Sequence, residues 1–262
     1  MPLTDRPIAT YIARSGLFED DWRVRVTRTR PWPVVLVHGT GHLKGVWEQL
    51  GGELRADGWA TFAPDYGDRA SKPLHESYDR LSAYADQVIQ ATGAERAILV
   101  GHSQGGLLAT LLSLAEPERF RHVVCLAAPN HGTSPGGERF GIMRFPQVRE
   151  LAETIIHGYW GQSGLEQLAG SPVVERVTSR GELPPDVTYT CIASRTDQLV
   201  RPPSSCFLED GGTGQVENIM IQDRFPRAIV LHEDLPRDAR VRRMVREALL
   251  KLVREELDDA RL

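Results

Sequence analysis

A serine framed by glycines stands where an apolar run of this sequence ends. Residues 101–105 read GHSQG, after the run AILV and before a second apolar stretch, LLATLLSLA. A sharp turn from a strand into a helix brings the residues two before and two after the serine together, and glycine leaves room for that approach. We interpret Ser103 as a nucleophile raised on such a turn, and a merely structural turn is the alternative.

A serine hydroxyl is a weak nucleophile at neutral pH and needs a base, usually an imidazole held by a carboxylate. In strand-turn-helix sites of this kind the acid and then the base follow the serine along the chain. Asp197 follows the apolar stretch VTYTCIAS, and His232 closes the apolar run AIVLH. We therefore expect Asp197 to orient His232, and His232 to take the proton of Ser103.

Other histidines and aspartates fit these roles less well. His131 follows an apolar run but precedes the acid, and His102 is expected to point away from its neighbour Ser103. Surface or core positions suit the remaining histidines considered, which are His42, His75, His122 and His157. Two other aspartates, Asp210 and Asp223, lie in predicted loops without an apolar strand before them.

Acyl transfer also needs donors for the negative oxygen that develops on the carbonyl. The backbone N–H of Gln104 is expected to be free in the first turn of the helix that follows Ser103. The loop HGTG after the first apolar strand offers the N–H of Thr40, with its hydroxyl as a further donor. A simple tight turn is the alternative interpretation of that loop.

The rest of the chain alternates predicted strands with predicted helices. Apolar runs predict strands within residues 33–39, 59–67, 96–103, 122–130, 187–197 and 227–232. Helical spacing of apolar residues predicts helices around Trp47 and Leu54 and over residues 77–93, 104–120 and 237–259. Residues 22–30, WRVRVTRTR, are expected to form the solvated face of an early strand. This alternation predicts an α/β fold whose ligands bind at the carboxyl ends of a mostly parallel sheet.

Several motifs together resemble the α/β-hydrolase family, and within it the bacterial class 2 lipases and esterases. They are VVLVHGTG, LVGHSQGG, APNHGTSPGG, SRTDQLVRP and VLHEDLPRD, and the likeness covers roughly residues 33–252. The resemblance implies a mostly parallel sheet with helices on both faces. It also implies Ser103, Asp197 and His232 as nucleophile, acid and base, with the amides of Thr40 and Gln104 as oxyanion donors. The loop NHGT, residues 130–133, is implied to shape the site without acting in catalysis.

The chain is expected to form one domain. It has 262 residues and no linker or repeat that would mark a boundary. Residues 136–171 fall where this family carries its cap, and Ile142, Met143, Phe145, Ile155, Ile156, Tyr159 and Trp160 are available there. We expect either a small cap lining an acyl pocket or a surface helix with an apolar underside.

Composition limits the partners and the location of the protein. A net charge of −4 without a large basic cluster argues against nucleic acid, and no apolar run approaches the ~18 residues of a membrane span. The start of the chain contains no signal peptide, which predicts a cytoplasmic protein, with a mature secreted form as the alternative. The export signal of secreted family members is therefore missing, so an extracellular triglyceride substrate is not implied. The oligomeric state stays open.

No metal-ligand spacing and no nucleotide fingerprint occurs, so we expect chemistry without a cofactor. Cys125 is expected to pack in the core, whereas Cys191 and Cys206 either pair in a disulfide or stay free.

Three functions remain to be compared. The first is a serine hydrolase that cleaves carboxylic esters through an acyl-enzyme. The second is an acyltransferase or thioesterase that uses the same three residues and a different acceptor or substrate. The third is a binding module without catalytic activity. An epoxide hydrolase needs a carboxylate where Ser103 stands, so that activity is not expected.

Overall fold

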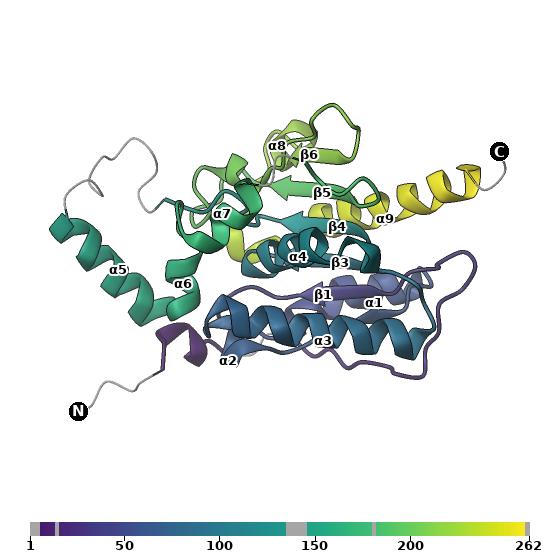
Figure 1. The fold of residues 1–262 in the computed structure, drawn as a ribbon, viewed down its shortest axis with the longest axis horizontal. Helices are drawn as coiled ribbons and strands as arrows, with labels where there is room; N and C mark the ends of the chain where they lie inside the picture. The colour runs from purple at the N-terminus through teal and green to yellow at the C-terminus, as the bar shows by residue number, and fades with distance from the viewer. Residues whose placement is uncertain (1–5, 14–15, 135–145, 180–181, 260–262) are drawn as a thin grey trace.

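A six-stranded parallel sheet forms the centre of the molecule. The computed structural model describes residues 6–13, 16–134, 146–179 and 182–259 (Figure 1). The strands lie in the order β2-β1-β3-β4-β5-β6, and every neighbouring pair is parallel. Their bounds are β1 Val34–Val37, β2 Thr61–Phe62, β3 Ala97–His102, β4 Phe120–Leu126, β5 Thr188–Ala193 and β6 Val216–Met220. The predicted α/β fold with a mostly parallel sheet is confirmed.

Helices connect these strands and cover both faces of the sheet. The α-helices are α1 Glu48–Ala56, α2 Gly67–Ala70, α3 Leu74–Thr92, α4 Gln104–Ala115, α5 Pro146–Trp160, α6 Gln162–Glu166, α7 Pro172–Thr178, α8 Ile221–Arg224 and α9 Ala239–Asp259. Short 3-10 helices are η1 Ile8–Tyr11, η2 Lys44–Trp47, η3 Pro117–Arg119, η5 Pro203–Cys206 and η6 His232–Asp234. Helix α3 ends where sequence analysis expects, because Gly93 takes the left-handed conformation with φ of 71°.

Alternate residues of the strands divide the core into two layers. Val35 and Leu99 pack with residues of α3 and α4 on one face of the sheet. Val34 and Ile98 pack with residues of α1 and α9 on the other. Because both faces are covered, the central strands consist of continuous apolar runs, as parallel sheets usually do.

Two predicted strands are wrong. Residues 227–232 do not form a strand, and the last strand among the described residues is β6. The sequence did not indicate β6, because a strand in which only Ile219 is buried has little apolar pattern. The backbone of Val230 is bound by side chains instead of a neighbouring strand, with Ser194 Oγ and Thr196 Oγ1 donating to its carbonyl. Residues 22–30 contain a turn closed between Thr27 and Arg30, and no strand forms there.

The segment expected to form a cap, residues 136–171, includes α5 and α6 and ends just before α7. Figure 1 shows α5 and α6 projecting beyond one end of the sheet. Ile142, Met143 and Phe145 lie outside the described residues. None of the helices among the described residues is long and apolar enough to cross a membrane.

All three cysteines are free and buried, so the disulfide considered between Cys191 and Cys206 does not form. Cys125 and Cys191 are neighbours in register on β4 and β5, which agrees with the core position expected for Cys125.

Candidate active site

Ser103 occupies a strained turn between β3 and α4. Its backbone has φ of 53° and ψ of −124°, a conformation that non-glycine residues rarely adopt. A Cβ atom on Gly101 would lie 2.3 Å from the carbonyl oxygen of Gly105, and one on Gly105 would lie 2.2 Å from that of Val37. Both positions therefore require glycine. The crowding at Gly101 is the close approach across the serine that GHSQG predicts, whereas Gly105 is crowded by the end of β1.

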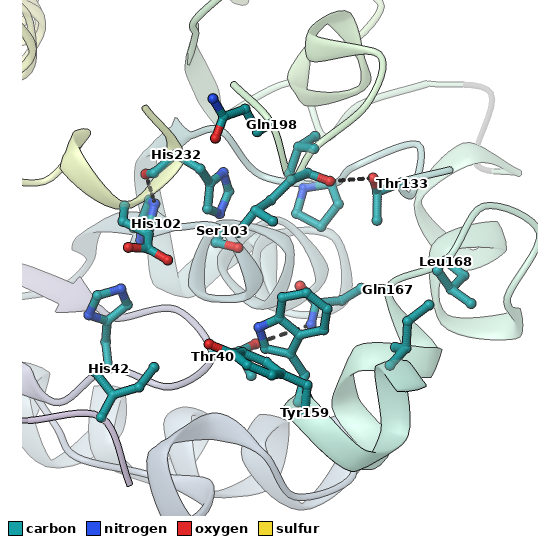
Figure 2. A pocket seen from close by; sticks show the side chains of 17 residues that line it. Thr40, His42, His102, Ser103, Thr133, Tyr159, Gln167, Leu168, Gln198 and His232 are labelled. Atoms are coloured by element: carbon teal, nitrogen blue, oxygen red, sulfur yellow. Dashed lines mark hydrogen bonds between the residues drawn. The ribbon is translucent and has the colours of Figure 1, made fainter. Parts of the chain in front are cut away.

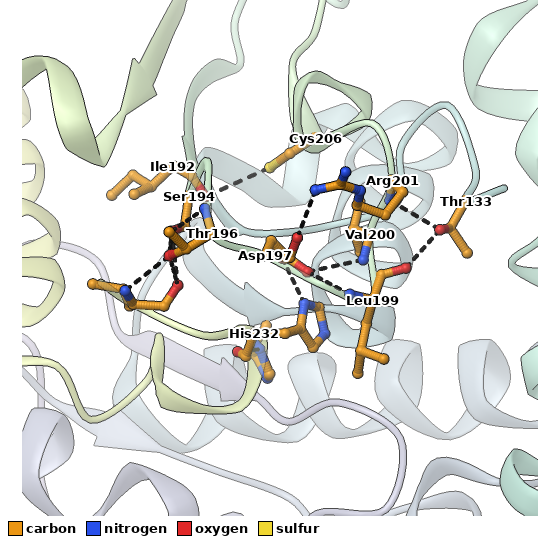
Figure 3. A network of polar contacts seen from close by, with 12 residues as sticks. Thr133, Ile192, Ser194, Thr196, Asp197, Leu199, Val200, Arg201, Cys206 and His232 are labelled. Carbon is orange, nitrogen blue, oxygen red and sulfur yellow. Dashed lines mark hydrogen bonds and ion pairs between the residues drawn. The ribbon is translucent and has the colours of Figure 1, made fainter. Parts of the chain in front are cut away.

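Asp197 and His232 are joined by a short hydrogen bond, with 2.7 Å between His232 Nδ1 and Asp197 Oδ2 (Figure 3). Asp197 follows β5 and is buried, and its Oδ1 accepts hydrogen bonds from the amides of Leu199 and Val200 at 2.8 and 2.9 Å. An ionised carboxylate only accepts hydrogen bonds, so Nδ1 of His232 carries the proton and Nε2 is left as an acceptor.

The side chains of Ser194 and Thr196 that bind the backbone of Val230 also position the segment that leads to His232. Val230 N donates to Thr196 Oγ1 at 3.0 Å, and its carbonyl accepts from Ser194 Oγ at 2.7 Å. These hydrogen bonds join Val230 to the loop that carries Asp197. They therefore hold Asp197 and His232 in position for the hydrogen bond between them.

Ser103 and His232 face the same cavity. Figure 2 shows both side chains directed into it. In the part of the chain that the structure describes, no hydrogen bond joins them, and in structures without substrate such contacts are often long.

The two expected oxyanion donors are the backbone amides of Thr40 and Gln104. Among the described residues, no acceptor binds the backbone N–H of Thr40 or of Gln104. A Cβ atom on Gly39 would lie 3.0 Å from the Cβ of Ser103, so the loop before Thr40 packs directly against the serine. The Thr40 hydroxyl, however, donates to Gln104 Oε1 at 2.5 Å, and it is therefore not available as the further donor that we expected.

His102 does more than the sequence indicated. We expected only that it points away from Ser103 and gave it no part in the site, but its buried ring lines the cavity and donates from Nε2 to the carbonyl of His232 at 2.9 Å (Figure 2). Burial lowers the pKa of His102 well below 6.5 and keeps the ring neutral, so Nε2 carries the only ring proton. No sequence pattern pointed to this contact, because it joins backbone and side chain across 130 residues.

His42 was also missed as a residue of the site. It lines the cavity, and burial, with smaller contributions from neighbouring cations and imidazoles, lowers its pKa to about 4. Its ring centroid lies 5.9 Å from that of His102, so a second neutral histidine borders the site.

The remaining alternatives lie elsewhere. His131 is exposed and binds the carbonyl of Phe207, and His122 is buried between Thr188 and Thr190. His75 on α3 and His157 on α5 are exposed as well. Asp223 pairs with Arg195, and Asp210 binds the amides of a surface turn.

The cavity measures about 330 Å³ and is largely apolar. Helix α5 contributes Ile156, Tyr159 and Trp160 to its wall, whereas Ile155 is 61% exposed on the other side of that helix. Further lining residues are Ile12, Pro129, Thr133, Gln167, Leu168, Gln198, Leu199, Val200 and Glu233. Such a space suits an apolar group held beside Ser103.

The NHGT loop lies at the edge of this cavity. The Thr133 hydroxyl donates to the carbonyl of Leu199 at 2.6 Å, and Asn130 is buried and donates to the carbonyl of Cys206. The loop thus supports the wall of the site. Nowhere in the described ranges do three or more His, Cys, Asp or Glu side chains form a group that could hold a metal ion.

Known proteins similar to parts of this chain include lipases and other hydrolases. A triacylglycerol lipase of Pseudarthrobacter phenanthrenivorans is 28% identical over 109 residues, which cover 39% of this chain and 34% of the lipase. Epoxide hydrolase A of Mycobacterium tuberculosis is 33% identical over 101 residues, covering 37% of this chain and 31% of that enzyme. The chain thus spans about a third of the length of these relatives.

Solved structures agree on the fold. Aspergillus fumigatus lipase B superposes with a TM-score of 0.61 at 18% identity, over 84% of this chain and 52% of the lipase. At that identity the likeness concerns the fold alone. The pattern of the family described as "Alpha/beta hydrolase family" matches residues 34–260 of this sequence. The chain belongs to the alpha/beta hydrolase family.

Proposed function

We propose that this protein hydrolyses carboxylic esters through an acyl-enzyme on Ser103. The observation that carries the proposal is the pairing of Asp197 with His232 Nδ1, which leaves Nε2 as a base facing the cavity that Ser103 lines. The lipase relatives support an ester substrate, and the apolar wall of the cavity supports an acyl group bound beside the serine.

The proposed reaction has two acyl-transfer steps. His232 Nε2 takes the proton of the Ser103 hydroxyl as its oxygen attacks the ester carbonyl, and then gives that proton to the departing alkoxide. Asp197 stabilises the imidazolium that forms between these events. In the second step, His232 removes a proton from water, and the water oxygen attacks the carbonyl of the acyl-enzyme. His232 then returns that proton to Ser103 Oγ as the acyl–oxygen bond breaks and the carboxylic acid leaves.

The amides of Thr40 and Gln104 are the proposed donors to the oxyanion. Both are free of other acceptors among the described residues, and both belong to segments that adjoin Ser103. Fixed amides stabilise the negative charge without reorganising, and losing one such donor typically costs ~3 kcal/mol of transition-state stabilisation.

A serine at residue 103 separates this proposal from epoxide hydrolysis. That reaction requires a carboxylate nucleophile, and a serine cannot form the alkyl-ester intermediate that a carboxylate forms. The epoxide hydrolase relative therefore supports the fold and the hydrolase family and gives no support to an epoxide substrate.

The proposal is tested with p-nitrophenyl esters from C2 to C16 and with the matching thioesters. Wild-type protein should release p-nitrophenol and free acid, and Ser103→Ala should lose the activity. A long-chain optimum would identify a lipase, and a short-chain optimum an esterase. A marked preference for thioesters, or transfer of the acyl group to an added alcohol in place of water, would replace ester hydrolysis by thioesterase or acyltransferase activity. A folded wild-type protein that gives no burst on any ester would contradict the proposal.

A further inference from the structure

Gln167 connects the segment after α6 to both residues that carry the proposed oxyanion amides. It follows α6 directly and is 7% exposed. Its Nε2 lies 3.2 Å from Thr40 Oγ1, 3.2 Å from Gln104 Oε1 and 3.0 Å from the carbonyl oxygen of Ser163. Figure 2 shows the amide of Gln167 directed toward Thr40.

These contacts close a triangle with the hydrogen bond from Thr40 Oγ1 to Gln104 Oε1. The three side chains come from the loop after β1, the first turn of α4 and the end of α6. Gln104 Nε2 is buried and has no partner among the described residues, so only Thr40 and Gln167 hold this amide. Without Gln167, one of the two hydrogen bonds to Gln104 Oε1 would be lost.

The backbone of Gln167 is itself anchored. Its carbonyl oxygen accepts a hydrogen bond from Thr133 N at 2.9 Å, and Ala169 N donates to the carbonyl of Thr133 at 3.0 Å. Gln167 therefore bridges the NHGT loop on one side of the site and the Thr40 loop on the other. A group fixed at both ends can hold its partners in one orientation, which preorganised donors require.

We propose that Gln167 is a positioning residue, which fixes the side chains of Thr40 and Gln104 and thereby the direction of their backbone N–H groups toward the oxyanion. The inference rests on the proposed function of those two amides. It extends the machinery of the site beyond the sheet to the segment expected as a cap. The triangle of hydrogen bonds positions donors for the negative oxygen that forms in the transition state and is absent from the bound ester. Loss of Gln167 should therefore lower kcat more than it changes KM.

The competing role for Gln167 is direct contact with bound substrate, since its side chain also lines the cavity. Such a contact would act on the ground state as well and would change KM. A split between kcat and KM therefore distinguishes positioning from simple lining of the cavity.

The test uses Gln167→Met, which keeps the length of an unbranched side chain and removes its amide. The matched control is Gln162→Met at the start of α6, because Gln162 is exposed and, among the described residues, its side chain bonds to Glu166 alone. Both variants are compared with wild type for thermal unfolding, for kcat and KM on p-nitrophenyl butyrate, and for inhibition by an alkylboronic acid, which forms a tetrahedral adduct with a serine.

We expect Gln167→Met to lower kcat about tenfold with KM within about twofold, and to weaken boronic acid inhibition by a similar factor. Gln162→Met should match wild type. A folded Gln167→Met protein with wild-type kcat, or with a change confined to KM, would overturn the inference.

Thr40→Val provides a second route, because it removes the hydroxyl of the triangle and keeps the backbone N–H. It should lower kcat on its own, and adding Gln167→Met to it should cost much less than Gln167→Met costs alone. Fully additive losses would overturn the inference. If Gln167→Met is too unstable to purify, Thr40→Val alone still tests the triangle, and a wild-type kcat for that variant would overturn the inference. Labelling of Ser103 by a fluorophosphonate is measured in the same experiments. If wild-type protein is not labelled, the proposed function itself is contradicted. If wild-type protein is labelled but Gln167→Met leaves kcat unchanged, only the inference about Gln167 is refuted.

Discussion

Asp197 Oδ2 and His232 Nδ1 lie 2.7 Å apart, although 35 residues separate them in the chain. Two sets of hydrogen bonds position this contact. In the turn after β5, two backbone amides donate to Asp197 Oδ1. Ser194 and Thr196 bind the backbone of Val230 and so hold the segment before His232. The carboxylate is therefore satisfied on both oxygens, and the imidazole is held in one tautomer.

Asp197→Asn tests the role of that contact. The asparagine would offer an N–H₂ or a neutral carbonyl to His232, which either turns the imidazole to the wrong tautomer or weakens its imidazolium. We expect kcat on a p-nitrophenyl ester to fall by about 10⁴-fold with little change in KM. The matched control is Asp223→Asn, since that exposed carboxylate pairs with Arg195 at the surface, and it should keep wild-type kcat. Equal rates for Asp197→Asn and wild type would exclude Asp197 as the acid.

His102→Phe tests the bond to the carbonyl of His232. The phenyl ring is planar and slightly larger than the imidazole, and it has no donor for the carbonyl of His232. We expect kcat to fall about tenfold, with KM and the unfolding midpoint nearly unchanged. His102→Gln places an amide near the former Nε2 and should restore most of the rate. If phenylalanine and glutamine variants are equally slow, the hydrogen bond has no part in the effect.

Gly105→Ala tests the strained turn through stability. Its new Cβ would meet the carbonyl oxygen of Val37 at 2.2 Å, so β1 or α4 must shift. We expect a loss of about 3 kcal/mol or more in the free energy of unfolding, measured in urea. Gly52→Ala is the control, because a Cβ there meets nothing within 4 Å and α1 gains helix propensity of about 1 kcal/mol. A tolerated alanine at residue 105 would mean that the turn is less crowded than described.

Buried histidines make stability depend on pH. Burial is the main cause that lowers the pKa of His122 to about 3, against an ordinary value near 6.5 in the unfolded chain. Between these values the unfolded chain binds a proton that the folded protein excludes, so stability is full above about pH 6.5 and falls as the pH is lowered. The slope contributed by this group is at most about 1.4 kcal/mol per pH unit.

His122→Asn should flatten that slope. We expect the free energy of unfolding, measured in urea between pH 7 and pH 4, to decline less steeply than in wild type. His75→Asn on the exposed face of α3 should leave the slope as it is. Parallel pH curves for His122→Asn and wild type would show that His122 takes up its proton equally in both states.

Sequence analysis predicted the elements with the strongest signals. The runs around Val35, Leu99 and Val124 are buried on both faces of the sheet, and each forms the strand expected of it. The order of serine, acid and histidine singled out Asp197 and His232, whose side chains meet in the structure. The catalytic roles of these residues stay predictions until they are measured.

The errors and omissions have a common physical origin. Residues 227–232 are as apolar as a strand, but polar side chains of the β5 loop bind their backbone, and β6 is a half-exposed edge strand with little apolar pattern. The side chains of His102 and Gln167 make hydrogen bonds to residues far along the chain, which no local pattern records. Tertiary contacts of this kind follow only from the folded arrangement.

The most direct test of the account is to find which residue carries the acyl group. Wild-type protein would be mixed with a fluorophosphonate or with p-nitrophenyl ester at low pH, digested, and mapped by mass spectrometry. The account predicts a single adduct on the peptide that contains Ser103, and none in Ser103→Ala. An adduct on any other residue, or undiminished labelling of Ser103→Ala, would contradict it.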